Sequence, residues 1–249
     1  MKLIAPFLFA TALLAHAEVK VTVGDISDKR TSGRSGFSGL DIELKIGGPE
    51  LADCKGLRVV VKEAKDDAGK AVKAQTNTFN EGGFESPQKA FGGGFGGDKK
   101  DEFQSKVELE NPARSAKSLS LDAAVELLIP SKDPTAVVSV DIAKEAGKVV
   151  AGDALKAAGV TITFKAPKDS EVGYTISDPG KKVASVEFCA PDGKPLETSG
   201  HMTSGFSGKK DVTVSLREEG GAKAVAKIYL VTAKSVVVVP VKLPSVTLP

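Results

Sequence analysis

Apolar and polar residues alternate along much of the chain, which is the pattern of β-strands that bury one face. The clearest case is Leu-Asp-Ile-Glu-Leu-Lys-Ile at residues 40–46, where every second residue is apolar. Gly, Pro and Asp residues separate the alternating segments, which favours antiparallel sandwiches over an α/β fold. We predict strands over residues 19–23, 40–46, 57–61, 103–109, 119–129, 136–142, 160–164, 172–176, 182–189, 212–216, 225–231 and 236–241.

A short motif, Ser-Gly-Phe-Ser-Gly, occurs at residues 35–39 and again at 204–208, each time as a loop before an alternating segment. This duplication indicates two related units. The one predicted helix, 153–159, has Asp153 as N-cap and Gly159 at its end, and we place the boundary between the units just before it. The predicted fold class is therefore all-β, with two tandem antiparallel β-sandwich domains at residues 18–148 and 149–249.

The C-terminal run of four valines, residues 236–239, lacks alternation. Such a strand is either buried on both faces or a site of aggregation if it lies at a sheet edge. Self-assembly into a surface layer or fibre through this strand is thus one alternative function.

The first residues have the order of a secretory signal peptide. Lys2 precedes an apolar stretch at residues 3–14, and Ala-His-Ala at 15–17 fits a cleavage site, so the mature chain is expected to begin at Glu18. The apolar stretch is too short to span a bilayer. We therefore predict a signal peptide over residues 1–17, and an exported protein, periplasmic or extracellular, with no membrane span.

Glycine and phenylalanine dominate residues 80–100, which predicts a long loop within the first domain. A phosphate-binding loop follows a strand and ends in a Lys-Ser or Lys-Thr pair that opens a helix, and this loop has neither feature. Phenylalanines in this loop and in the duplicated motif are candidate partner contacts: Phe37, Phe91, Phe95 and Phe206. The alternative for Phe37 and Phe206 is that each fills the core of its own domain.

Composition narrows the classes of function. The formal net charge is +2, which falls to +1 when Lys2 is removed, so there is no electrostatic case for binding nucleic acid. The two cysteines, Cys54 and Cys189, form either one disulfide between the halves or two free thiols. Alternation places Cys189 on the face of its strand opposite Phe188, which predicts that the thiol points outward.

Groups that could carry catalysis are few. His201 is the only histidine after the signal segment, and an acyl-transfer reaction would use it as the base for Ser204 or Ser207. Paired carboxylates could serve glycoside hydrolysis, although the chain has no Trp to form a sugar platform. We predict a non-enzymatic protein without catalytic residues, cofactor or metal site, with a hydrolase as the alternative.

The strand-turn segments at residues 64–70 and 190–194, together with the paired Ser-Gly-Phe-Ser-Gly loops, carry a resemblance to exported bacterial proteins with tandem immunoglobulin-like or fibronectin-like sandwiches. The resemblance covers the mature chain by pattern only. The chain departs from antibody domains because it has no Trp and no Cys pair within either half. No immunoglobulin-family binding role is therefore carried over from the resemblance. The signal segment, the duplicated strand pattern and the shortage of catalytic groups instead favour a protein that binds or scaffolds another macromolecule in the cell envelope, while oligomeric state stays open.

Overall fold

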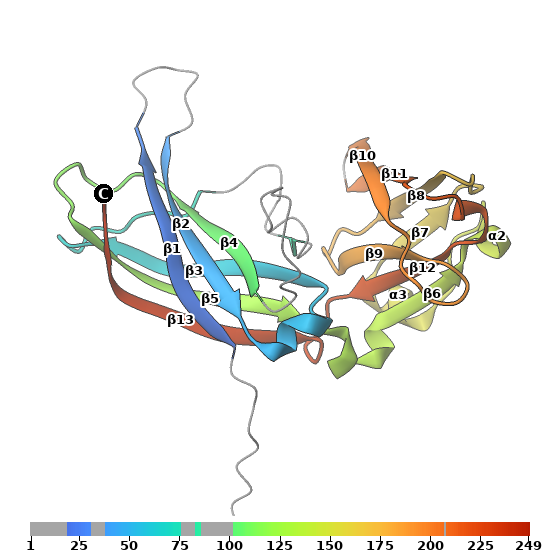
Figure 1. Ribbon diagram of the computed structural model, residues 1–249, viewed down its shortest axis with the longest axis horizontal. Helices are drawn as coiled ribbons and strands as arrows, with labels where there is room; N and C mark the ends of the chain where they lie inside the picture. Colours follow the sequence, from blue (N-terminus) through green and yellow to red (C-terminus); the bar gives the residue numbers. More distant parts are fainter. Residues whose placement is uncertain (1–18, 31–37, 76–82, 86–101, 207) are drawn as a thin grey trace, which may run out of the picture.

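The computed structural model describes residues 19–30, 38–75, 83–85, 102–206 and 208–249, which form four antiparallel β-sheets. The sheets pack in pairs around two hydrophobic clusters. We call the two resulting bodies unit 1 and unit 2; they lie side by side in Figure 1. Every strand expected from alternation is present, so the all-β prediction is confirmed.

Unit 1 consists of two three-stranded sheets with the orders β1-β2-β4 and β13-β5-β3. A short 3-10 helix, η1, connects β2 to β3, and two more, η2 and η3, follow β5. The bounds are β1 Lys20–Lys29, β2 Gly39–Gly47, η1 Pro49–Asp53, β3 Gly56–Asp66, β4 Glu102–Leu109, β5 Ser118–Leu128, η2 Pro130–Lys132, η3 Pro134–Ala136 and β13 Val236–Thr247.

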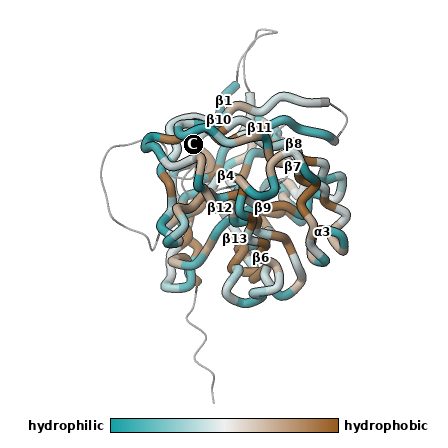
Figure 2. The backbone as a smooth tube through the Cα atoms, turned by 90° about the vertical axis from the view of Figure 1, so that its right-hand side faces the viewer, coloured by the Kyte–Doolittle hydropathy of each residue, from teal (hydrophilic) through white to brown (hydrophobic). Residues whose placement is uncertain are grey.

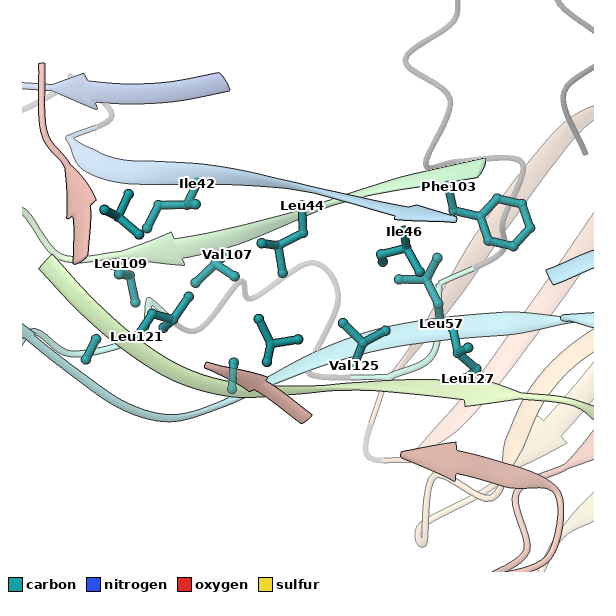
Figure 3. Close-up of a cluster of buried hydrophobic side chains, with 14 of the residues drawn as sticks. Ile42, Leu44, Ile46, Leu57, Phe103, Val107, Leu109, Leu121, Val125 and Leu127 are labelled. Atoms are coloured by element: carbon teal, nitrogen blue, oxygen red, sulfur yellow. The ribbon is translucent and has the colours of Figure 1, made fainter. Parts of the chain in front are cut away.

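The core of unit 1 lies between its two sheets. On β2, Leu40, Ile42, Leu44 and Ile46 are fully buried, as the alternation predicted. Figure 3 shows side chains of β2 and β4 facing those of β3 and β5 across this core. Burial of each such side chain contributes about 1.5–3 kcal/mol relative to leaving it exposed, which explains why these strands keep one register.

Unit 2 pairs a three-stranded sheet, β6-β12-β9, with a four-stranded sheet, β10-β11-β8-β7. Figure 2 views the molecule from the end formed by this unit. The bounds are β6 Val137–Asp141, α2 Ile142–Glu145, α3 Asp153–Ala158, β7 Thr161–Phe164, β8 Glu171–Ser177, β9 Val183–Cys189, β10 Thr198–Phe206, β11 Lys209–Leu216, η4 Gly221–Lys223 and β12 Val225–Leu230.

The core of unit 2 contains three aromatic residues that pack against one another. The ring of Tyr174 lies 5.7 Å from that of Phe164 and 6.3 Å from that of Phe188, between centroids. Burial raises the pKa of Tyr174 to about 12. The predicted helix is present as α3 and ends at Gly159 in the left-handed conformation, but its N-cap is Gly152 instead of Asp153.

The connectivity of the two units is nested, and this corrects the tandem arrangement. The chain leaves unit 1 after β5, builds all of unit 2 from β6 to β12, and returns to unit 1 with β13, which pairs with β5 along ten residue pairs from Val236 to Thr247. The predicted boundary between residues 148 and 149 would assign β6 to the first domain and β13 to the second. In the structure β6 belongs to unit 2 and β13 belongs to unit 1. The local sequence of a strand does not identify a pairing partner so distant in the chain, so the nested connectivity could not be predicted.

One strand was not foreseen. Residues 198–206, which lie outside the predicted strands, form β10 and pair with β11 from Thr198↔Leu216 to Phe206↔Lys209. The second Ser-Gly-Phe-Ser-Gly motif consequently spans the end of a strand and the turn of a hairpin. The first motif precedes β2 in the β1–β2 hairpin, and only its last two residues, Ser38 and Gly39, fall within the described part of the chain.

Candidate functional site

An ion pair joins the two units. The ammonium of Lys55, which follows η1, lies 2.9 Å from Oε1 of Glu187 on β9. The hydroxyl of Tyr229 donates to Oε2 of the same carboxylate at 2.9 Å, and Lys55 Nζ lies 5.5 Å from the centre of the Tyr229 ring. Burial, and then the Glu187 charge, raise the pKa of Tyr229. Each carboxylate oxygen of Glu187 thus has a partner in the joint, which makes this cluster a structural contact.

A second network lies where the chain crosses between units. The carboxylate of Asp133 accepts hydrogen bonds from the hydroxyls of Thr135, at 2.6 Å, and Thr232, at 2.7 Å. These bonds hold the pKa of Asp133 below its ordinary value, the bond from Thr135 first. Ser235 adds a backbone link, since its carbonyl accepts the N–H of Ile129 at 2.7 Å. The outgoing and returning segments are therefore fastened to each other.

The two cysteines are free and buried in the structure. Cys54 donates to the carbonyl of Gly56 at 3.1 Å, and burial raises the pKa of its thiol to about 11. Cys189 is only 1% exposed, so the prediction that it points outward is wrong. After β9 the chain turns back, and Pro195 forms a backbone bridge to Cys189. Neither thiol has the exposure that a reactive cysteine needs.

The acyl-transfer residues are not brought together. His201 and Ser204 both lie on β10, separated by three positions, so alternation places their side chains on opposite faces of the strand. Nδ1 of His201 lies 3.5 Å from the hydroxyl of Thr203, and both side chains are exposed. Ser207, the other candidate nucleophile, lies outside the described residues.

Adjacent carboxylates such as Asp66 and Asp67 have the oxygen atoms that Ca²⁺ prefers, but both have other partners in the structure. Oδ1 of Asp66 accepts the backbone N–H groups of Ala68 and Lys70, and Oδ2 of Asp67 accepts that of Lys117. These contacts fix the turn after β3. Over the residues that the structure describes, no three His, Cys, Asp or Glu side chains gather where they could hold a metal.

A shallow depression of about 520 Å³ lies beside α3, between residues 149 and 161. Its only ionisable side chains are Asp153 and Lys156. It therefore lacks the pair of carboxylates that glycoside hydrolysis uses.

Of the four phenylalanines predicted as partner contacts, only Phe206 belongs to a described strand. Phe37, Phe91 and Phe95 lie outside the described residues. Phe206 ends β10, and its backbone pairs with Lys209. The role of these four rings stays a prediction.

The feature with the clearest capacity to bind is the edge of unit 2 formed by β10. Among the described strands only β11 pairs with β10, and we call the opposite side of β10, as far as the described residues show it, its free edge. All residues from Thr198 to Gly205 are exposed, and Met202 is 70% exposed. Figure 2 shows β10 beside β11 at the rim of this unit.

The free edge of β10 lacks the features that usually prevent edge pairing, namely charged residues and proline. Each of the other edge strands in the described sheets has such a residue, or, in β7, hydrogen bonds from residues 147 and 150 along its outer side. Residues that protect the other edges include Asp25, Lys62, Lys106, Asp141, Glu187 and Pro240. A nine-residue uncharged edge is thus exceptional in this molecule.

Glycine sets the end of this edge. Gly205 has φ +153°, and a Cβ placed there would lie 2.3 Å from the carbonyl oxygen of Lys209. Gly208, in the turn, has φ +80°. The glycines of the second Ser-Gly-Phe-Ser-Gly motif therefore have a structural cause, because the hairpin cannot close at this position with a larger residue.

No described helix is long and apolar enough to cross a membrane. Comparison with known proteins gives no match to any family model and no matching curated protein.

Proposed function

We propose that this chain is an exported, non-enzymatic protein that binds or scaffolds another macromolecule of the cell envelope, and that the free edge of β10 is its contact. In this proposal residues 1–17 are a cleaved signal peptide, and units 1 and 2 are immunoglobulin-like sandwiches. The observation that carries the proposal is the nine-residue, uncharged edge strand, whose residues 198–205 are exposed.

The physical argument concerns backbone groups. An edge strand presents a row of N–H and C=O groups that are ready to pair with another strand. Each backbone hydrogen bond gained in such pairing contributes about 0.5–1.5 kcal/mol net, and several act together along an edge of this length. Addition of a strand to an exposed edge is a general mode of protein recognition. The contact we propose is therefore with a protein partner that presents an extended segment.

The ionisable groups of the described residues support a binding role. Lys55, Glu187 and Asp133 hold the two units together, and Asp66 and Asp67 fix a turn. Because these charged side chains hold the structure together, they favour two rigidly connected units that present a fixed surface to a partner.

A pull-down tests the proposal. Tagged protein beginning at Glu18 is incubated with envelope extract and with untagged copies of itself, and bound proteins are compared with those bound by Met202→Lys. The control is Val238→Lys, because Val238 is also exposed, at 57%, on an edge strand, β13. We expect bound protein to be lost with Met202→Lys and kept with Val238→Lys. Equal recovery with both variants would refute the proposed contact.

A further inference from the structure

The edge of β10 carries opposite charges near its two ends. At the hairpin turn, exposed Lys209 and Lys210 begin β11. Asp211 follows, but it lies 3.7 Å from the ammonium of Lys165 and is hydrogen-bonded to Thr175, so it is neutralised within the same sheet. The turn end of the edge is therefore cationic.

The other end of the edge is acidic. Glu197 directly precedes β10, and exposed Glu218 and Glu219 follow β11 on the adjacent strand end. The one cation among them, Arg217, lies 3.7 Å from Glu197. Three carboxylates and one guanidinium leave this end with a net negative charge, because the two glutamates after Arg217 have no cation next to them in the chain.

This distribution fits a second copy of the same chain. When two β10 strands pair in antiparallel fashion, a two-fold axis brings the same edge of both copies together. The cationic turn end of each copy then lies beside the acidic end of the other. Parallel pairing would instead put like charges together. We infer that the free edge of β10 is occupied by β10 of a second copy, in an antiparallel two-fold dimer; this inference rests on the proposed role of the edge as a contact.

The dimensions agree with this pairing. With the axis at Met202, Thr198 of one copy lies opposite Phe206 of the other, and Lys209 is one strand further away. Neighbouring strands in a sheet are about 4.8 Å apart. The backbone of Lys209 and the end of β10 in the second copy are two strand spacings apart, which is roughly 10 Å. Lysine and glutamate side chains together span this separation. The two sheets β10-β11-β8-β7 would join into one continuous sheet across the dimer.

The first test introduces like charges at the axis. In purified protein studied by sedimentation equilibrium, we expect the unaltered chain to dimerise and Met202→Lys to raise the dimer dissociation constant at least tenfold. Two lysines would then face each other at a Cα separation of about 5 Å. Because Met202 is 70% exposed, the substitution leaves the core of unit 2 unchanged. Val238→Lys on β13 is the matched control and is expected to dimerise normally.

The second test exchanges charges. One variant carries Lys209→Glu and Lys210→Glu, and another carries Glu197→Lys and Glu218→Lys. Each alone places like charges at both ends of the dimer, so each is expected to dimerise at least tenfold more weakly. An equimolar mixture restores opposite charges at both ends and is expected to form heterodimers. Heterodimers no stronger than either homodimer would overturn antiparallel self-pairing.

The outcomes separate this inference from the proposed function. A purified protein that stays monomeric, while Met202→Lys abolishes capture from envelope extract, would overturn self-pairing and leave the contact at β10 standing. A dimer that Met202→Lys does not weaken would place the interface elsewhere and also overturn the inference. If Met202→Lys changes neither the dimerisation of the purified protein nor the capture of proteins from envelope extract, both proposals are refuted.

Discussion

Strands β10 and β13 are both edge strands, but they differ in composition and in what they bury. β13 contributes Val241 and Val246 to the core of unit 1 and carries Pro240, Lys242 and Pro244 along its length. β10 has no proline and no charged residue, and its residues 198–205 are all exposed. Proline and lysine discourage pairing with another strand. One edge therefore completes a core and is protected, whereas the other contributes little to its core and is open.

Removal of β13 should produce the largest effect. A chain that ends at Ser235 lacks Val241 and Val246 and leaves β5 without one of its two neighbours. We expect unit 1 to unfold, because β5 is the central strand of its sheet. Hydrogen exchange measured by mass spectrometry should show lost protection in β2 and β5, with β8 and β11 still protected.

The corresponding change in β10 is Thr203→Pro, which disturbs an exposed strand without removing core residues. We expect increased exchange in β10 and β11 only. If truncation at Ser235 instead unfolds unit 2 and spares unit 1, the nested connectivity is wrong and the tandem arrangement is correct.

A pH dependence should follow from the thiol next to the β13 sheet. The Cys54 thiol lies against the backbone of Leu128 of β5, which pairs with Val236 of β13. Burial raises the pKa of Cys54 from 9.0 to about 11, so the folded state keeps the proton that the unfolded state loses. The contribution of the protonated Cys54 thiol to the free energy of unfolding is complete below pH 9 and is lost as the pH rises through 11. At about 1.4 kcal/mol per pKa unit, we expect the free energy of unfolding of unit 1 to fall by roughly 2–3 kcal/mol.

Denaturant titrations from pH 8 to 11 would measure this loss, with Cys54→Ala as the comparison. The variant should lose less stability over the same range. Tyr174, in unit 2, gives its own loss above pH 10 in both proteins, because burial raises its pKa to about 12. An equal alkaline loss in unit 1 of both proteins would contradict burial of Cys54.

A smaller effect is expected at the end of β10. Gly205→Ala would place a Cβ 2.3 Å from the carbonyl oxygen of Lys209 and strain a backbone with φ +153°. We expect a cost of about 1–3 kcal/mol, confined to the hairpin. Gly200→Ala is the matched control, since a Cβ there would lie 3.7 Å from Ser215, an ordinary contact. Local hydrogen exchange of β10 and β11 distinguishes the two; equal exchange would mean that Gly205 is not required.

Alternation was sufficient to predict strands that bury one face. On β2 the pattern identified the four buried apolar side chains, because burial of such side chains is what fixes the register of the strand. β10 was not predicted because it lacks this pattern. Its sequence, Thr-Ser-Gly-His-Met-Thr-Ser-Gly-Phe, has no alternation, and the strand exists through backbone pairing with β11.

Contacts between distant segments could not be predicted. The valine run of β13 indicated a strand but not its partner, which lies more than a hundred residues earlier in β5. The same limit applies to the joint between Lys55 and Glu187. The open edge became recognisable only when the pairing of every strand was known.

Disulfide trapping tests the difference between the two edges most directly. In the proposed dimer, residue 202 of each copy faces residue 202 of the other at a Cα separation of about 5 Å, within the range that a disulfide spans. Under mild oxidation, Met202→Cys should form a covalent dimer while Val238→Cys stays monomeric, with Cys54 and Cys189 buried in both variants. No covalent dimer of Met202→Cys, or equal dimer from both variants, would contradict pairing at β10.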